Sequence, residues 1–83
     1  MMNLNSILLE GTVASVNPER KLLQIKHVST PFHFVVNYGA IKFVPAVGQA
    51  YRVVGSLGFY MPTEGYPELE VCIDAQYIEP TIH

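Results

Sequence analysis

Aromatic rings and cations are the side chains in this 83-residue sequence with the clearest chemical potential. Single-stranded nucleic acid binds to proteins through rings that stack on its bases and cations that follow its phosphates. The stretch TPFHFVVNYG (residues 30–39) places Phe32, Phe34 and Tyr38 on one parity of an expected strand and His33 on the other. Because a strand normally turns its apolar face to a core, the same pattern also fits ordinary packing.

The remaining candidates for this chemistry are spread along the chain. The rings available for stacking are Phe32, Phe34, Tyr38, Phe59, Tyr60 and Tyr66. The cations are Arg20, Lys21, Lys26, Lys42 and Arg52. Since aromatic residues of small β-barrels usually lie in the core, composition leaves both interpretations open.

Catalytic and metal-binding patterns are not evident. None of His27, His33 and His83 lies near a candidate nucleophile in sequence, and Cys72 falls within an expected strand. His27 and His33 are six residues apart, with the strand-breaking segment Ser29-Thr30-Pro31 between them. This spacing is not that of metal ligands. No glycine motif for phosphate binding occurs. We therefore expect no enzymatic activity, no metal and no cofactor.

Composition places the chain among small globular domains. It is 49% hydrophobic and 14% charged, which excludes a disordered tail. A domain of this length is only marginally stable alone, so self-association is plausible. A single cysteine suits a reducing compartment, and neither a secretion signal nor a membrane-length apolar segment is recognisable. We expect a cytoplasmic protein with no membrane partner.

The charge is unevenly distributed. The formal net charge is −2, yet all five basic residues precede position 53 and five of the seven acids lie in the last 20 positions. Such a division is compatible with a mildly basic face, and equally with chance scatter of surface charges.

Hydrophobic periodicity predicts an all-β domain spanning residues 1–83. The expected strands cover residues 6–16, 21–28, 30–39, 50–60 and 68–78. Glycines inside the first and fourth of these indicate bends of the kind found at barrel corners. Residues 40–47, interrupted by Pro45, allow at most one short helical turn. Five short strands with one connector between the third and fourth favour a small closed or partly open barrel.

The alternation is clearest in the last strand. One parity carries Leu69, Val71, Ile73, Ala75 and Tyr77, and the other carries Glu68, Glu70, Cys72, Asp74 and Gln76. This pattern predicts a half-buried strand whose first set faces the core.

Four segments taken together resemble the bacterial single-stranded DNA-binding protein family. They are NSILLEGTV, TPFHFVVNYGAIKFV, GQAYRVVGSL and VCIDAQYIEP, in this order and spacing. The resemblance implies a five-stranded OB-fold barrel that binds single-stranded DNA without sequence preference. It also implies a homo-oligomer, dimer or tetramer, with a part in DNA replication, repair or recombination.

The resemblance assigns roles by position. Phe32 falls on a base-stacking tryptophan of the family and Tyr38 on a base-stacking phenylalanine, whereas Arg52 falls on a fourth-strand position that faces DNA. Phe59 and Tyr60 match a further family aromatic only approximately. The other implied DNA contacts are Phe34, Lys26 and Lys42. The implied subunit contacts are His33, Ile7 and Leu9.

The sequence also departs from the family pattern. Phe34 replaces a typical arginine, which removes a phosphate contact. Residues 29–31 stand where the family has a long hairpin, residues 40–47 are shorter than its helix, and its glycine-rich linker and acidic tail are not found. These departures favour an alternative, an OB-fold module for protein–protein interaction or oligomerisation with little or no nucleic-acid binding. RNA or a small ligand on the same rings is a third possibility.

Overall fold

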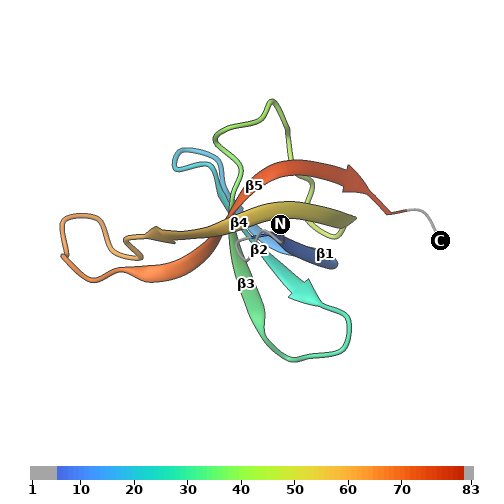
Figure 1. Cartoon of the computed structure of the whole chain (residues 1–83), viewed down its shortest axis with the longest axis horizontal. Helices are drawn as coiled ribbons and strands as arrows, with labels where there is room; N and C mark the ends of the chain where they lie inside the picture. The colour runs from blue at the N-terminus through green and yellow to red at the C-terminus, as the bar shows by residue number, and fades with distance from the viewer. Residues whose placement is uncertain (1–5, 82–83) are drawn as a thin grey trace.

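The computed structural model describes residues 6–81, which form five strands and no helix (Figure 1). The strands are β1 (Ile7–Asn17), β2 (Leu22–His27), β3 (His33–Asn37), β4 (Ala50–Tyr60) and β5 (Glu70–Pro80). They close into one barrel in the order β1-β2-β3-β5-β4. The expectation of an all-β, five-stranded, OB-fold-like barrel is confirmed. Within the described residues there is no helix that could cross a membrane.

All neighbouring strands are antiparallel except β3 and β5, which run parallel and close the barrel. This closing contact is short, because the register pairs only Val36 with Ile73 and Asn37 with Asp74. In contrast, β4 and β5 stay paired along their whole length, from Tyr51 to Tyr60. The barrel is therefore firmly closed on most sides and weakly closed between β3 and β5.

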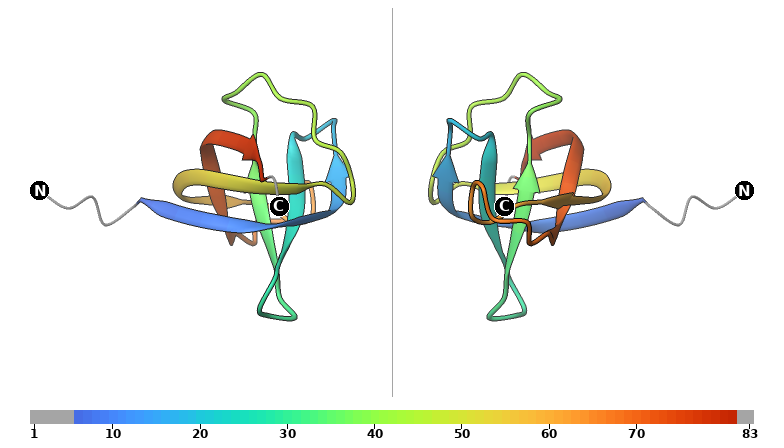
Figure 2. Two further views of the ribbon diagram at one scale, coloured as in Figure 1. Left: turned by 90° about the vertical axis from the view of Figure 1, so that its right-hand side faces the viewer. Right: turned by 90° about the vertical axis from the view of Figure 1, so that its left-hand side faces the viewer.

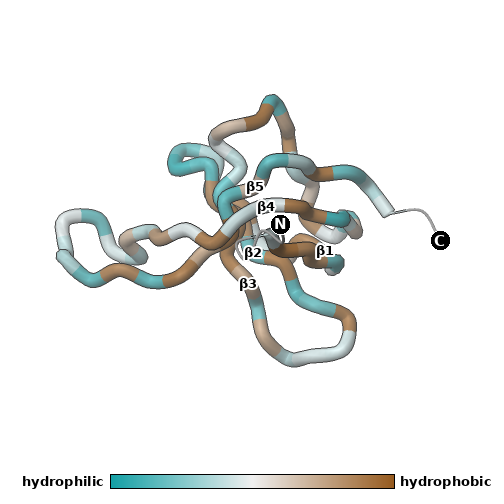
Figure 3. Tube along the Cα trace, in the orientation of Figure 1, coloured by the Kyte–Doolittle hydropathy of each residue, from teal (hydrophilic) through white to brown (hydrophobic). Residues whose placement is uncertain are grey.

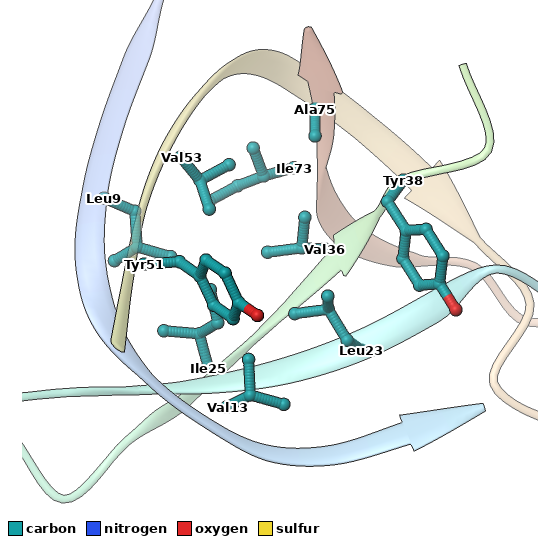
Figure 4. Packing of buried hydrophobic residues seen from close by; sticks show 10 residues of the cluster. All are labelled: Leu9, Val13, Leu23, Ile25, Val36, Tyr38, Tyr51, Val53, Ile73 and Ala75. Atoms are coloured by element: carbon teal, nitrogen blue, oxygen red, sulfur yellow. The ribbon is translucent and has the colours of Figure 1, made fainter. Parts of the chain in front are cut away.

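The core consists of alternate residues that all five strands turn inward (Figure 4). Ile25, Val36 and Val53 are completely buried at its centre. Burying each of these side chains stabilises the fold by about 1.5–3 kcal/mol relative to an exposed position. The core also includes two tyrosines, Tyr38 and Tyr51.

The β3–β4 connector caps one end of the barrel. It contains no helical turn, and Phe43 packs edge-on against Tyr38 at 6.0 Å and against Tyr51 at 5.0 Å between ring centroids. The connector returns to β1 through hydrogen bonds in which Gly48 N donates to Val13 O and Val13 N donates to Gln49 O. The backbone turns at Gly48 with a φ of +89°, which glycine adopts without strain.

A β-bulge in the β4–β5 pair changes the expected alternation of the last strand. Val54 pairs with Tyr77, but the next residue, Gly55, pairs with Ala75. The extra residue sends Tyr77 to the outer face beside Val54, where it is more than half exposed. The prediction that Tyr77 shares the inward face with Ile73 and Ala75 is therefore wrong.

Two hairpins extend beyond the barrel (Figures 1 and 2). The β2–β3 hairpin projects away from the capped end. The second extension, which we call the arm, comprises residues 56–74 of β4, β5 and their connecting turn. The pairing of β1 with β4 stops at Ile7 and Gly55, so β4 leaves the barrel wall at that point. In β5, only Ile73 and Asp74 of the arm still pair with β3.

Candidate nucleic-acid interface

One groove crosses the outer surface where the arm approaches β2 and β3. It consists of two depressions that share Val35 and Tyr60. The first, of about 270 Å³, lies toward the β1–β2 turn and includes Arg20, Gln24 and Pro62 in its lining. In OB-folds, the outer face of the second and third strands and the loops beside it form the usual binding surface for oligonucleotides and oligosaccharides.

The second depression exists because β3 and β5 are paired over only two residues. Their register begins at Val36 and Ile73 and continues only to Asn37 and Asp74, so the residues that precede Val36 in β3 and Ile73 in β5 are not paired with each other. The opening is lined by His33, Phe34, Val35, Tyr60 and residues 69–73. It carries both apolar groups and flat rings, which suits a ligand with planar faces.

Arg20 ties the β1–β2 turn to the arm across the groove. Its guanidinium donates hydrogen bonds to the carbonyl oxygens of Met61, at 2.6 Å, and Pro62, at 3.4 Å. The turn presents Arg20 through a tight bend, in which Arg20 N donates to Asn17 Oδ1 and Lys21 adopts a φ of +58°. Sequence reasoning treated Arg20 as a cation for phosphates, and nothing local in the sequence indicated this bridge between residues 41 positions apart.

Tyr60 is the ring at the centre of the groove. Its hydroxyl donates to Glu70 Oε2 at 3.1 Å, which fixes the orientation of the ring. Partial burial raises the pKa of Tyr60, and the hydrogen bond to Glu70 and the charge of that carboxylate add to the effect. Tyr60 therefore remains a neutral, flat side chain at physiological pH.

Polar side chains from β2 and β3 continue the outer face beside the groove. Lys26 lies opposite His33 in the β2–β3 register and is exposed. His33 Nδ1 is 3.2 Å from Gln24 Oε1, so these two groups form a hydrogen bond on the same face. Lys26 is thus exposed on the outer face of β2, although it lines neither depression.

The phenylalanines predicted to stack occupy three different environments. Phe34 pairs with the buried Ile25, yet it is 37% exposed because it lies where the second depression opens. Phe32 is 66% exposed on the β2–β3 hairpin. Phe59 is 63% exposed on the arm, opposite Val71, and lines neither depression. The structure therefore brings Phe34 and Tyr60 together and leaves Phe59 outside the groove.

Two predicted contact residues lie in the core instead. Tyr38, expected to stack on a base, is 2% exposed, and Leu9, expected to contact another subunit, is 6% exposed. Ile7 is partly buried against the same core, and of the expected subunit contacts only His33 is fully on the surface. The side of β3 that was expected to stack on bases is its inner side, because Val36 and Tyr38 are buried there. Phe34 lies on the same side and is open only because it borders the second depression, which His33 and Val35 also line.

Arg52 is engaged by carboxylates on the outer face of β1, β4 and β5. Its Nε is 2.8 Å from Glu10 Oε1 and its Nη1 is 3.3 Å from Glu79 Oε1. The hydrogen bond and charge of Glu10 raise the pKa of Arg52, and Glu79 adds a smaller effect. With two acids beside it, Arg52 offers no net positive charge to a phosphate. Lys42 is exposed on the β3–β4 connector and lines neither depression.

Cys72 lies beneath the floor of the groove. It is 2% exposed, and its thiol donates to Asp74 Oδ1 at 3.6 Å. Burial, and then the charge and hydrogen bond of Asp74, raise the pKa of Cys72 to about 11. An ordinary thiol has a pKa near 8.5, and only the thiolate is reactive.

We expect the free energy of unfolding to fall as the pH rises from about 9 toward 11. Because the pKa of Cys72 is raised in the folded chain, its contribution is complete below the pKa of the unfolded thiol and is lost as the pH approaches the folded value. Tyr60 and Tyr77, whose pKa values are also raised, act in the same direction. Urea unfolding followed by circular dichroism from pH 7 to 11 measures the effect.

The variant Cys72→Ala is the control for this pH dependence. It should weaken the alkaline loss of stability between pH 9 and 11, although its stability at pH 7 is also lower. In the parent chain, Ellman's reagent at pH 8 should modify Cys72 at least about 100-fold more slowly in the folded state than in urea. The reason is that a thiol with a pKa of about 11 is only about 0.1% thiolate at pH 8. Equal rates in the two states would contradict the burial of this thiol.

Comparison with known proteins gives no relatives: no protein-family model, curated protein or solved structure matches the chain. The resemblance of its four segments to the bacterial single-stranded DNA-binding proteins thus remains a prediction. The candidate site depends on the geometry of the groove.

Proposed function

We propose that this protein binds single-stranded DNA without sequence preference in the groove between β3 and the arm, and that it does so as a homo-oligomer. The observation that carries this proposal is that Tyr60 from β4 and Phe34 from β3 line the same depression, which lies beside the strands that commonly bind oligonucleotides in OB-folds. Stacking on such rings contributes about 1–3 kcal/mol per base and tolerates every base. The resemblance supports the same function, with DNA replication, repair and recombination as the proposed settings.

The electrostatics of the groove make the binding of one subunit weak. Arg20 lines the first depression and Lys26 is exposed on β2 outside both depressions, whereas Glu70 places a carboxylate beside Tyr60. Two or three stacked bases and about two phosphate contacts correspond to micromolar or weaker binding by a monomer. Linked subunits on one strand would raise the affinity through their high effective concentration.

A second candidate function is a protein-interaction module. The observations that favour it are the pairing of Arg52 with Glu10 and Glu79 and the apolar residues that the arm exposes. In this case the aromatic side chains contact protein, and nucleic acid is not bound.

Titration of fluorescently labelled oligo-dT with the protein distinguishes the two functions. We expect anisotropy to rise at about 20 mM salt, where attraction between charges is least screened. The logarithm of the binding constant should fall with the logarithm of the salt concentration with a slope of about −1.4 per subunit, as expected for about two phosphate contacts on a single strand.

The absence of binding at 20 mM salt and millimolar protein would contradict the proposed function and leave the interaction module. A parallel titration with oligo-rU tests the choice of nucleic acid. Equal affinity for the two strands would broaden the proposal to single-stranded nucleic acid, because stacking alone does not distinguish the sugars.

A further inference from the structure

The arm exposes an apolar face of which only one half belongs to the proposed DNA groove. We define the arm face by Leu57, Phe59, Leu69 and Val71, each of which is about half exposed or more. The register pairs Phe59 with Val71 and places Leu57 opposite Ile73, so these side chains lie on one side of the two-stranded ribbon. Leu57 and Phe59 line neither part of the groove.

The arm face is the continuation of the core face of the barrel. Along β4 the inward positions run from Val53 through Gly55 to Leu57 and Phe59, and the exposure rises from zero to 63% along this row. The apolar character of both strands persists into the arm (Figure 3). Nothing in the described part of the chain continues the barrel wall over this row, because the β1–β4 register ends at Ile7 and Gly55.

We propose that the arm face binds the arm face of a second copy of this chain, as a two-fold symmetric dimer. In a two-fold interface the same surface meets itself, so any net charge on it would be repelled by its own copy. The arm face carries no charged side chain, whereas the outer faces of β1, β4 and β5 carry Glu10, Arg52 and Glu79. The arm face offers no cation to a polyanion, and Leu57 and Phe59 lie outside the groove, so we assign these two side chains to the second copy and not to DNA.

The backbone at the edge of the arm supports the same partner. From Ser56 to Tyr60, β4 is paired with β5 on one side, and within residues 6–81 no strand is paired with its other edge. An unpaired, apolar strand edge is a template for another strand. Two identical β4 edges can pair antiparallel about a two-fold axis, which would add main-chain hydrogen bonds to the contact between the apolar faces.

This interface replaces the subunit contacts expected from the sequence. Leu9 is in the core and Ile7 is partly buried, so neither provides an open surface. The inference names the interface of the homo-oligomer in the proposed function, and it rests only on the proposal that the protein forms an oligomer. It does not require that the groove binds DNA, and its test contains no DNA.

The mass of the protein in solution, measured by sedimentation equilibrium, tests this inference. We expect the parent 9.3 kDa chain to reach twice its mass at micromolar concentrations. The variant Leu57→Lys, which places an ammonium group against its own copy, should raise the dimer dissociation constant at least about 30-fold. Two matched controls, Val44→Lys on the exposed connector and Leu8→Lys on the outer face of β1, should leave it unchanged.

A cysteine variant keeps the inference testable if Leu57→Lys fails to fold. Because Cys72 is buried, Phe59→Cys provides the accessible thiol, and a short bismaleimide should link two copies of this variant but not two copies of Val44→Cys. A monomeric parent at millimolar concentration would overturn the inference. A dimer that Leu8→Lys disrupts while Leu57→Lys does not would also overturn it, as would cross-linking through Val44→Cys alone. DNA binding by the same variants is a separate measurement, which tests the proposed function and not the dimer.

Discussion

Replacement of both Tyr60 and Phe34 by alanine is expected to weaken the binding of oligo-dT by at least about 30-fold, since each stacked base contributes about 1–3 kcal/mol. The two rings are the aromatic side chains that the structure brings into one groove, from β4 and β3. Each single substitution should weaken binding by about 5-fold or more. Anisotropy of labelled oligo-dT at low salt measures the change without relying on tyrosine emission.

Two further variants separate stacking from other causes. Tyr60→Phe keeps the ring and removes the hydrogen bond to Glu70, so we expect it to retain affinity. Tyr77→Ala removes an exposed tyrosine whose hydroxyl donates to Glu79 in the barrel part of β5, outside both the arm and the groove, and should also bind normally. Unchanged affinity of the folded double variant would exclude the groove as the stacking surface.

The strands could be predicted from sequence because each has its own local signal. The five predicted strands match the observed ones within a few residues at their ends, since period-two patterning and turn residues are local properties. Proline at position 45 correctly argued against a helix between β3 and β4. The five-stranded barrel then follows from the number of strands and the bends at their glycines.

The faces of those strands were harder to predict, because parity alone does not say which side of a strand is inside. The two-residue alternation of β3 was visible, but the inward side was decided by contacts with β2 and β5. Tyr38 therefore lies in the core although its sequence position suggested stacking. Tyr77 escaped prediction for a different reason, because a single extra residue in β5 moves every later side chain to the opposite face.

The groove itself could not be predicted, because its residues come together only through the barrel. Arg20 meets Met61 from the far part of the chain, and Glu70 meets Tyr60 across a hairpin. Arg52 is the converse case, since a cation that suggested phosphate binding is paired with Glu10 and Glu79 from two other strands. Such pairings depend on register, which no local pattern of charge contains.

The two ends of the barrel explain why one chain offers two surfaces. Phe43 covers the end near the connector, where it packs against Tyr38 and Tyr51. Toward the arm, the inward row passes Gly55 and continues in Leu57 and Phe59 without a cover from the described residues. The groove lies where the arm approaches β2 and β3, and the inner side of the arm carries an exposed apolar patch of the kind that marks an interaction site. Leu57 and Phe59 can therefore be mutated without altering a groove residue, whereas Leu69 and Val71 belong to both surfaces.

The substitution Gly11→Ala is expected to lower the free energy of unfolding by about 3 kcal/mol, near the upper end of the usual cost of overpacking. A Cβ at this position would lie 2.3 Å from the carbonyl oxygen of Lys26 and 2.5 Å from Cγ2 of Ile25. Neither neighbour can yield easily, because one is backbone and the other belongs to a completely buried side chain. A domain of this length has roughly 4–12 kcal/mol in total, so a large part of its stability would be lost.

Gly39→Ala is the matched control for this substitution. Its Cβ would meet only side-chain atoms, the nearest being Asn37 Oδ1 at 3.2 Å, so we expect a change within about 0.5 kcal/mol. Urea unfolding followed by circular dichroism compares the two variants with the parent chain. A Gly11→Ala variant as stable as Gly39→Ala would show that β1 and β2 lie farther apart than the register of Gly11 with His27 requires. That result would also displace Lys26 on the outer face of β2, because the same pair of strands positions it beside the groove.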